Sequence, residues 1–560
     1  MTAASGGRPF EAVADETFRV PMRDGVHLAT DCYLPAAVRE GGCVPAVMLR
    51  GPYGRRDDIS FIPALARLLL DRGWAVVAQD VRGKWDSEGE ATPFAAEVAD
   101  GSDTLDWIVG RPWSDGRVVA MGDSYLGYTT WAAATSGHPG LVAAITRVTS
   151  TQPGRDWFAR GGILRPELFV EWGANWWTGP AIGDLVPDWS RRPLAAIADA
   201  GGPAARALLD RWVQAMEADD AATLGALDPA AVGAITIPML HVGGLFDVFL
   251  GGQLADWHAA SGGPHGAGHR LVLDVTDHTF NRLAAPGVRR PDLIADPALR
   301  AARLPLELAA ELRFLEAILD GQPFDGPVVS WFMGNDGWHG SATWPPEGST
   351  TLDLFPVDVT AAFTGPEGGI LAPTTEHLET HISWVHDPAD PVPSLVTEWF
   401  RPLFTATDET EVEGRPDVAT FTGHQLDTPL DLAGPVRLHA ATHHAAGSGH
   451  LMAKLVDVFP TGFAQRIAEG AALVRGPGEA VEVTVELGDA AYRVLPGHRL
   501  RLEIAASAYP RYAIHPGTDD DWWAGDRMAP AEQRLEIGRG RTRLTLTVLP
   551  GGITTEPAHD

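Results

Sequence analysis

The chain has 560 residues and a formal net charge of −30 at pH 7, because 73 Asp and Glu residues outnumber 43 Lys and Arg residues. A charge of this sign repels nucleic acids and anionic membranes, so neither is expected as a partner. Hydrophobic residues make up 45% of the chain and charged residues 21%. This composition is typical of a globular protein and excludes both a disordered chain and a membrane protein.

The N-terminal residues 1–16 have neither a basic start nor an apolar core, so the sequence predicts no export signal and a cytoplasmic location. The two cysteines, Cys32 and Cys43, are too few for a disulfide scaffold, although a bridge between them stays open. The sequence also leaves open whether the chain forms a homo-oligomer.

Residues 1–150 alternate short apolar runs with helix-like stretches. The apolar runs do not alternate with polar residues, which is typical of strands buried on both faces of a parallel sheet. These runs lie at 45–49, 75–78 and 118–121. A helix is expected over 97–109, between two of them. The pattern predicts an α/β domain.

Residues 151–234 differ from the preceding part because helix-like segments predominate and strand-like runs are few. Strand-like runs then resume at 238–244 and 269–274. We therefore expect a helical insertion inside one α/β domain, whose second part covers residues 235–345.

The last part of the chain, residues 346–560, has an apolar period of two. Apolar and polar residues alternate over 481–487 and again over 544–548. Strands with one apolar face are typical of an antiparallel sandwich, so a separate β-domain is predicted here.

Ser124 is a candidate nucleophile because it lies at the junction of the strand predicted at 118–121 and a helix-like stretch. At such a turn the serine hydroxyl points out above the sheet, and the flanking Gly122 and Gly127 tolerate the strained backbone. Leu126 stands where the usual G-x-S-x-G motif has its second glycine. The motif alone therefore fits a helix N-cap serine equally well.

A nucleophilic serine needs a histidine as its base and a carboxylate that orients the histidine. In α/β-hydrolases the acid and then the histidine follow the serine along the chain, on loops after later strands. Asp247 follows the strand predicted at 238–244, and His278 follows the strand predicted at 269–274. These two residues are the candidates for the acid and the base.

Six segments spread over nearly the whole chain carry a family resemblance. They read VPMRDGVHLATDCYLP, RGPYGR, QDVRGKWDSEGE, DWIVGRPWSDGRVVAMGDSYLGYTTWAAA, VGGLFDVFLGG and SAYPRYAIHPGT. They resemble the cocaine esterase and X-Pro dipeptidyl-peptidase family of serine hydrolases, whose own serine motif has the form G-x-S-Y-x-G. The resemblance implies an α/β-hydrolase domain with an inserted helical cap, followed by a C-terminal jelly-roll β-sandwich domain.

The same resemblance implies the roles of the site residues. Ser124 would be the nucleophile, His278 the general base and acid, and Asp247 the orienting carboxylate. The backbone N–H of Tyr125 and the hydroxyl of Tyr53 would form the oxyanion hole. The family chemistry requires no cofactor and no metal.

The insertion contains many aromatic residues. Its six tryptophans are Trp157, Trp172, Trp176, Trp177, Trp189 and Trp212. Because the family folds this insertion over the active site, a pocket wall and an ordinary core are equally favoured interpretations. Trp172, Trp176 and Trp177 are the first choices for a substrate pocket.

The insertion is also acidic. Family members that act on α-amino-acid esters or dipeptides hold a substrate ammonium group with an acidic cluster. The candidates here are Glu167, Glu171, Asp184 and Asp188. The sequence leaves open whether any of them converge.

Two further features have competing interpretations. Asp123 places a carboxylate beside the candidate nucleophile; we expect it to face solvent, and the alternative is that it tunes protonation of the site. His443, His444 and His450 could suggest a metal site, but no cysteine and no HExxH motif accompany them. We interpret these histidines as part of a polar loop.

The sequence thus predicts a serine hydrolase that cleaves a small-molecule carboxylic ester or amide through an acyl-enzyme on Ser124. One alternative is acyl transfer to an amine or alcohol, and another is activity of the X-Pro dipeptidyl-peptidase or α-amino-acid ester hydrolase kind. A catalytically silent binding module is disfavoured because Tyr53, Ser124, Asp247 and His278 are retained together.

Overall fold

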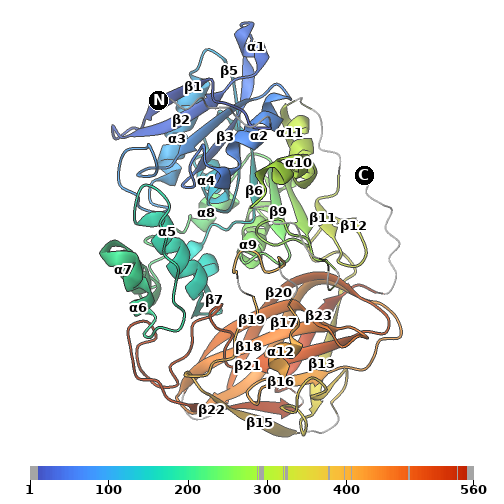
Figure 1. Cartoon of the computed structure of the whole chain (residues 1–560). Helices are drawn as coiled ribbons and strands as arrows, with labels where there is room; N and C mark the ends of the chain where they lie inside the picture. The colour runs from blue at the N-terminus through green and yellow to red at the C-terminus, as the bar shows by residue number, and fades with distance from the viewer. Residues whose placement is uncertain are drawn as a thin grey trace.

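A computed structural model describes residues 10–550, apart from 285, 287, 289–294, 320, 322–325, 376–378, 397, 405–406, 477–479 and 539. The N-terminal part forms an α/β domain, drawn blue to yellow-green at the top of Figure 1, and the C-terminal part forms a β-sandwich below it. The insertion, drawn in teal, lies beside both.

A mixed sheet is the centre of the α/β domain. Its strands are β1 (Glu16–Pro21), β2 (His27–Tyr33), β3 (Val44–Gly51), β4 (Ala75–Asp80), β5 (Ser114–Asp123), β6 (Leu141–Arg147), β9 (Met239–Gly244), β10 (His269–Asp274), β11 (Val329–Phe332) and β12 (Trp338–Ser341). Their order in the described part of the chain is β1-β2-β4-β3-β5-β6-β9-β10-β11-β12. The pairs β1–β2, β2–β4 and β11–β12 are antiparallel, and the neighbours from β4 to β11 are parallel.

Helices cover both faces of this sheet, which explains why its central strands are apolar without alternation. On one side lie α2 (Ile62–Leu70), α10 (Pro297–Glu307) and α11 (Ala309–Leu319), and on the other lie α3 (Glu97–Val109), α4 (Ser124–Thr135), α8 (Pro229–Gly233) and α9 (Leu250–Ser261). Along β3, Ala46 and Met48 face the α3 and α4 side, whereas Val47 and Leu49 face the α2 side. The short α1 (Ala36–Arg39) lies between β2 and β3.

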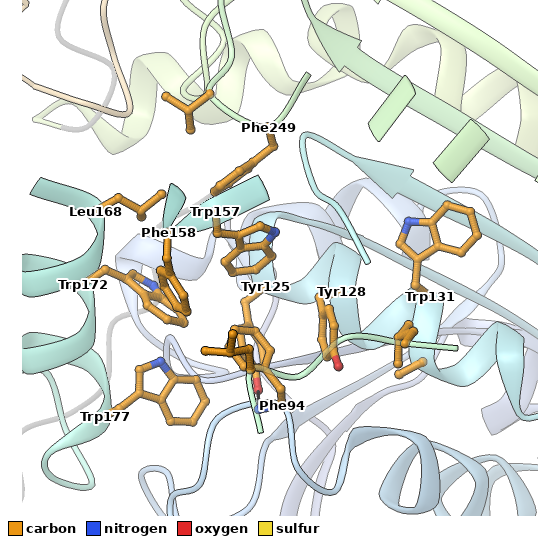
Figure 2. Packing of buried hydrophobic residues seen from close by; sticks show 14 of the residues in the cluster. Phe94, Tyr125, Tyr128, Trp131, Trp157, Phe158, Leu168, Trp172, Trp177 and Phe249 are labelled. Carbon is orange, nitrogen blue, oxygen red and sulfur yellow. Dashed lines mark hydrogen bonds between the residues drawn. The ribbon is translucent and has the colours of Figure 1, made fainter. Parts of the chain in front are cut away.

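The insertion between β6 and β9 is mainly helical. It contains η2 (Pro153–Trp157), β7 (Ala159–Arg160), β8 (Ile163–Leu164), η3 (Glu167–Trp172), α5 (Gly173–Trp177), α6 (Ala195–Ala198), η4 (Asp199–Gly201) and α7 (Gly202–Glu217), followed by α8. Its aromatic side chains interlock with those of the α/β domain, as the packing of Phe94, Tyr125, Trp157, Phe158 and Trp172 shows (Figure 2). This shared cluster fixes the insertion over the carboxyl ends of the parallel strands.

The C-terminal part is a two-layered β-sandwich with a jelly-roll arrangement. Its strands are β13 (Thr350–Asp358), β14 (Gly369–Ala372), β15 (Glu379–His386), β16 (Ala419–Thr422), β17 (Leu430–His444), β18 (Ser448–Val458), β19 (Ala464–Arg475), β20 (Val481–Val494), β21 (Arg499–Ala505), β22 (Ala531–Gly538) and β23 (Arg543–Val548), with α12 (Thr410–Glu413) between β15 and β16. Along β23, Leu544, Leu546 and Val548 are buried, as the period of two predicts. The strand orders and the sandwich confirm the fold class predicted from the sequence.

The histidines near residue 445 are a correction to the sequence interpretation. His443 and His444 end β17 and His450 lies in β18, so they belong to paired strands and not to a polar loop. His444 and His450 are also buried. The error arose because histidine and glycine weaken a strand pattern, whereas long neighbouring strands bury the side chains.

The loop between β21 and β22 connects the sandwich to the insertion. Tyr512, Ala513 and Trp523 belong to the same buried cluster as the insertion aromatics. The Trp523 indole N–H donates to Asp210 Oδ1 at 2.7 Å, and the Trp523 carbonyl accepts from the Ala195 N–H at 3.0 Å. One buried cluster therefore contains residues from all three parts of the chain, while the sandwich interior forms a cluster of its own.

Two remaining expectations concern cysteines and membranes. Cys32 is buried, Cys43 is exposed, and both are free thiols. Within the described ranges, no helix is long and apolar enough to cross a membrane.

Candidate active site

Ser124 occupies a strained turn between β5 and α4. Its φ is +54°, a left-handed value that is uncommon for a residue other than glycine. A Cβ atom at Gly122 would collide with Leu126, and one at Gly127 would lie 2.7 Å from Thr149 Cγ2. Both flanking positions therefore need glycine so that α4 can pack closely on the strands, which explains the late glycine of the motif.

His278 and Asp247 are paired above the same sheet edge. The Nδ1 atom of His278 lies 2.7 Å from Asp247 Oδ1, and Asp247 Oδ2 accepts from the Phe249 N–H at 3.0 Å. The Asp247 side chain is fully buried. Burial acts to lower the pKa of His278, but the carboxylates of Asp247, Asp123 and Asp277 together hold it above its ordinary value.

The loop that carries His278 is organised by the buried carboxylate of Asp277. Its Oδ1 accepts from the N–H groups of Thr279 and Asn281, both at 3.0 Å. Its Oδ2 accepts from the N–H of Leu403 at 3.1 Å. The segment between β15 and α12 is thereby tied to the loop of the candidate base.

Tyr53 lies in the loop after β3, beside Ser124. Burial raises the pKa of its hydroxyl to about 12, while hydrogen bonds with the Ser124 side chain, the Trp172 side chain and the Tyr125 backbone oppose the rise. The Trp172 indole N–H donates to the Tyr53 oxygen at 3.3 Å. The loop is anchored by the Arg55 N–H, which donates to Asp80 Oδ1 at 2.7 Å. The Tyr53 hydroxyl is thus hydrogen-bonded with both the Ser124 side chain and the Tyr125 backbone.

The ring of Tyr125 fixes the first turn of α4. Its hydroxyl donates to Glu97 Oε1 at 3.0 Å and accepts from the Phe94 N–H at 2.8 Å. Glu97 is in turn paired with the buried Arg50 at 3.1 Å. This chain of contacts holds the Tyr125 backbone next to Ser124.

The three tryptophans expected at the pocket lie around these tyrosines. Trp176 packs edge-on against Tyr53 with ring centroids 4.5 Å apart, and Trp172 binds the Tyr53 hydroxyl. Trp177 packs against Tyr125 at 5.1 Å, and its ring lies beside Trp172 in the aromatic cluster (Figure 2). Trp176 is partly exposed, whereas the other two are buried.

Two of the four acidic candidates of the insertion lie in the element that ends at Trp172. Glu167 and Glu171 lie in η3, whereas Asp184 and Asp188 are exposed. Burial, and then the nearby carboxylate of Glu398, raise the pKa of Glu171. Burial raises the pKa of Glu167 to about 7, with Glu171 and Glu398 adding to the rise and Arg511 opposing it.

The sequence did not point to Phe249, Glu398 or Trp399. The rings of Phe249 and Trp399 lie 5.2 Å and 5.8 Å from the His278 ring. Phe249 could have been found as the aromatic residue two positions after Asp247. Glu398 and Trp399 lie in a segment far along the chain that only the tertiary fold brings to the His278 loop.

Among the described residues, no group of three or more His, Cys, Asp or Glu side chains is placed to hold a metal ion.

Two family models match the chain. The model for X-Pro dipeptidyl-peptidase (S15 family) matches residues 24–280. The model for the X-Pro dipeptidyl-peptidase C-terminal non-catalytic domain matches residues 325–534. Together they cover the insertion, most of the sandwich and most of the α/β domain, but residues 281–324, which include α10 and α11, lie between the two matches.

Relatives and solved structures agree with these matches. A cocaine esterase from Rhodococcus sp. (strain MB1 Bresler) is 31% identical over 533 residues, which cover 89% of this chain and 92% of that protein. The crystal structure of an aminopeptidase from a marine sediment archaeon, Thaumarchaeota archaeon, superposes with a TM-score of 0.80 at 23% identity, covering 98% of this chain and 99% of the other. An α-amino acid ester hydrolase superposes with a TM-score of 0.78 at 22% identity, with the same coverage. The two structures share the fold of this chain over nearly its whole length.

Proposed function

Because the chain belongs to the X-Pro dipeptidyl-peptidase (S15) and cocaine esterase family, and is a serine hydrolase of the esterase and peptidase kind, we propose that it cleaves a small-molecule carboxylic ester or amide through an acyl-enzyme on Ser124. One observation carries the proposal. His278 Nδ1 lies 2.7 Å from Asp247 Oδ1, at the sheet edge where the Tyr53 hydroxyl is hydrogen-bonded with the Ser124 side chain.

In the acylation step, Ser124 Oγ attacks the carbonyl carbon of the substrate while His278 Nε2 takes the hydroxyl proton. Asp247 holds the other ring nitrogen and stabilises the imidazolium that forms. The Tyr53 hydroxyl and the Tyr125 N–H donate to the oxygen on which negative charge develops. His278 then returns the proton to the departing alcohol or amine, and the acyl group remains on Ser124.

Deacylation repeats these steps with water as the nucleophile. His278 takes a proton from the water, the hydroxide attacks the acyl carbon, and the proton passes to Ser124 Oγ as the carboxylic acid leaves. An amine or alcohol in place of water would yield acyl transfer instead. Product analysis with a competing nucleophile separates these two outcomes.

The test is Ser124→Ala, assayed with a panel of small esters and amides and with a phosphonate probe. Turnover should fall by about 10⁴-fold or more because the triad acts as a unit, and the variant should melt like the wild type. In the wild type, mass spectrometry should find the probe on Ser124. Probe on another residue, or full activity of the variant, would overturn the nucleophile assignment.

A second candidate is an activity on substrates that carry an ammonium group near the scissile bond. It is favoured by Glu171 and Glu398, whose carboxylates interact. Glu171 precedes Trp172, which binds Tyr53, and Glu398 precedes Trp399, which packs on His278. Glu398 also pairs with Arg401, so a substrate ammonium group that reached Glu171 and Glu398 would bind beside this ion pair through charge-assisted hydrogen bonds.

A further inference from the structure

Asp123 is a charged residue in the strand next to the nucleophile. It is the last residue of β5, half-buried, and its side chain caps no N–H of α4. It lines a cavity of about 60 Å³ together with Arg147, Phe280, Arg300 and Glu311. The expectation that Asp123 simply faces solvent is therefore wrong, because helices α10 and α11 and the His278 loop enclose this side of the sheet.

Arg300 is the cation that this cavity places opposite Asp123. It comes from α10 and is only 7% exposed, so its charge requires compensation inside the protein. Its guanidinium stacks on the ring of Phe61 and lies 6.0 Å from the ring of Phe280. Burial acts to lower the pKa of Arg300, and Asp123 and Glu307 are the carboxylates that oppose this.

The neighbouring cation, Arg147, is neutralised separately. Its guanidinium donates to Glu311 Oε1 at 2.7 Å and to the Glu307 carbonyl at 3.1 Å. It also lies 3.7 Å from the centroid of the Phe280 ring. Glu311 is thus paired with Arg147. Of the two carboxylates that line the cavity, Asp123 is the one left to balance the charge of Arg300.

Phe280 joins this cavity to the catalytic loop. It follows His278 by two residues and has a left-handed φ of +64°. The guanidinium of Arg147 lies directly over its ring, and that of Arg300 is more distant, at 6.0 Å from the ring centroid. Asp123 therefore shares this cavity with Phe280 and the buried Arg300, and its carboxylate also acts on the imidazole of His278.

From this arrangement we propose that Asp123 is a second carboxylate acting on His278, with Arg300 as the counter-ion that sets the strength of its effect. Asp123 is a positioning residue in this proposal, since it acts through His278 and touches neither substrate nor reacting atoms. The inference rests on the proposed roles of Ser124 and His278.

The sign of the effect follows from the charges around the imidazole. The carboxylates of Asp247, Asp123 and Asp277 all favour the protonated ring. Removal of the Asp123 charge should therefore lower the pKa of His278, so the base stays neutral and active at lower pH. Removal of the Arg300 charge should leave Asp123 unopposed and shift the pKa in the other direction.

The experiment measures the rate of phosphonate labelling of Ser124 and kcat/KM between about pH 5 and pH 9. On the acid side of both profiles the rate falls as His278 becomes protonated, and this acid limb has a midpoint pH. Asp123→Asn should shift that midpoint to lower pH by about 0.5 pH unit or more, and Arg300→Met should shift it to higher pH. The double variant should lie between the two. Asp123→Val serves as a second neutral variant, and thermal melts report folding of each protein.

Two controls separate this inference from the proposed function. Asp427→Asn removes one exposed carboxylate of the sandwich and should leave the limb in place. His278→Ala should abolish labelling; normal labelling in this variant would overturn the proposed function itself. If His278→Ala abolishes labelling but folded Asp123→Asn and Asp123→Val keep the wild-type limb, the triad stands and the role of Asp123 is refuted.

Discussion

The hydroxyl of Tyr53 has one proton to donate, and its surroundings decide where that proton points. The indole N–H of Trp172 is a donor with no acceptor capacity, so the Tyr53 oxygen must accept from it. The phenol proton is then left for an acceptor on the Ser124 side. Burial raises the pKa of Tyr53 to about 12, which keeps the phenol protonated at neutral pH.

Tyr53→Phe tests this donor because it removes one oxygen and leaves the ring. We expect kcat to fall roughly 10²- to 10³-fold, the loss typical of one oxyanion-hole donor. KM should change much less, since the ground-state carbonyl carries little of the developing charge. Steady-state kinetics on an ester substrate provide the measurement.

Tyr128→Phe is the matched control, because Tyr128 is a buried tyrosine one turn along α4. Its hydroxyl donates to the Gly225 carbonyl at 2.6 Å and does not touch the site. This variant should lose about 1 kcal/mol of stability and retain kcat. If Tyr53→Phe turned over at the wild-type rate while Tyr128→Phe behaved as described, Tyr53 would have no part in the mechanism.

At the scale of elements, the described part of the sandwich buries five histidines, and four of them have lowered pKa values. His386 ends β15, His444 ends β17, His450 lies in β18, and His515 lies in the loop after β21. The rings of His450 and His515 are 5.1 Å apart. Burial lowers the pKa of all four, to about 4 for His444 and His515.

These lowered pKa values predict an acid-sensitive sandwich. Between about pH 6.5 and pH 4 the unfolded chain binds protons at these histidines and the folded chain does not, so stability falls as the pH falls through this window. Thermal melts should show a steep loss of Tm there. His450→Leu should flatten the dependence, because one titrating group is gone.

The control for this prediction is His381→Gln, on the exposed face of β15. It removes a histidine that the strand leaves in solvent, so the slope of Tm against pH should not change. An equal flattening in both variants would contradict the assignment of the acid sensitivity to the buried histidines.

At the scale of the whole molecule, the site is built from all three parts of the chain. The α/β domain carries Ser124 and His278, the insertion carries Glu171, and the segment that follows β15 carries Glu398. Since Glu171 and Glu398 come from different parts, a subsite formed by both exists only in the assembled fold.

If these two carboxylates bind a substrate ammonium group, Glu171→Gln and Glu398→Gln should each raise KM for an amino-bearing ester by about tenfold, equivalent to about 1.4 kcal/mol. KM for the matching ester without the amine should stay unchanged. Asp188→Asn is the control, because Asp188 is exposed in the same insertion. Equal changes in KM for both esters would show that Glu171 and Glu398 do not bind the ammonium group.

The sequence by itself determined the features that depend on local patterns. Apolar runs, the period of two and the glycines around Ser124 predicted β3, β5, β23 and the strained turn, because strand burial and a left-handed φ restrict residue choice locally. The order of Ser124, Asp247 and His278 along the chain placed them on loops at one sheet edge.

The tertiary structure decided the features that depend on distant segments. The burial of His450, the cavity shared by Asp123 and Arg300, and the contact of Trp399 with His278 each join residues far apart along the chain. No local pattern encodes such a meeting, because strand pairing and helix packing set it only after the chain has folded. The same reason applies to charge: the environment of Asp123 depends on Arg300, which the sequence places 177 residues away.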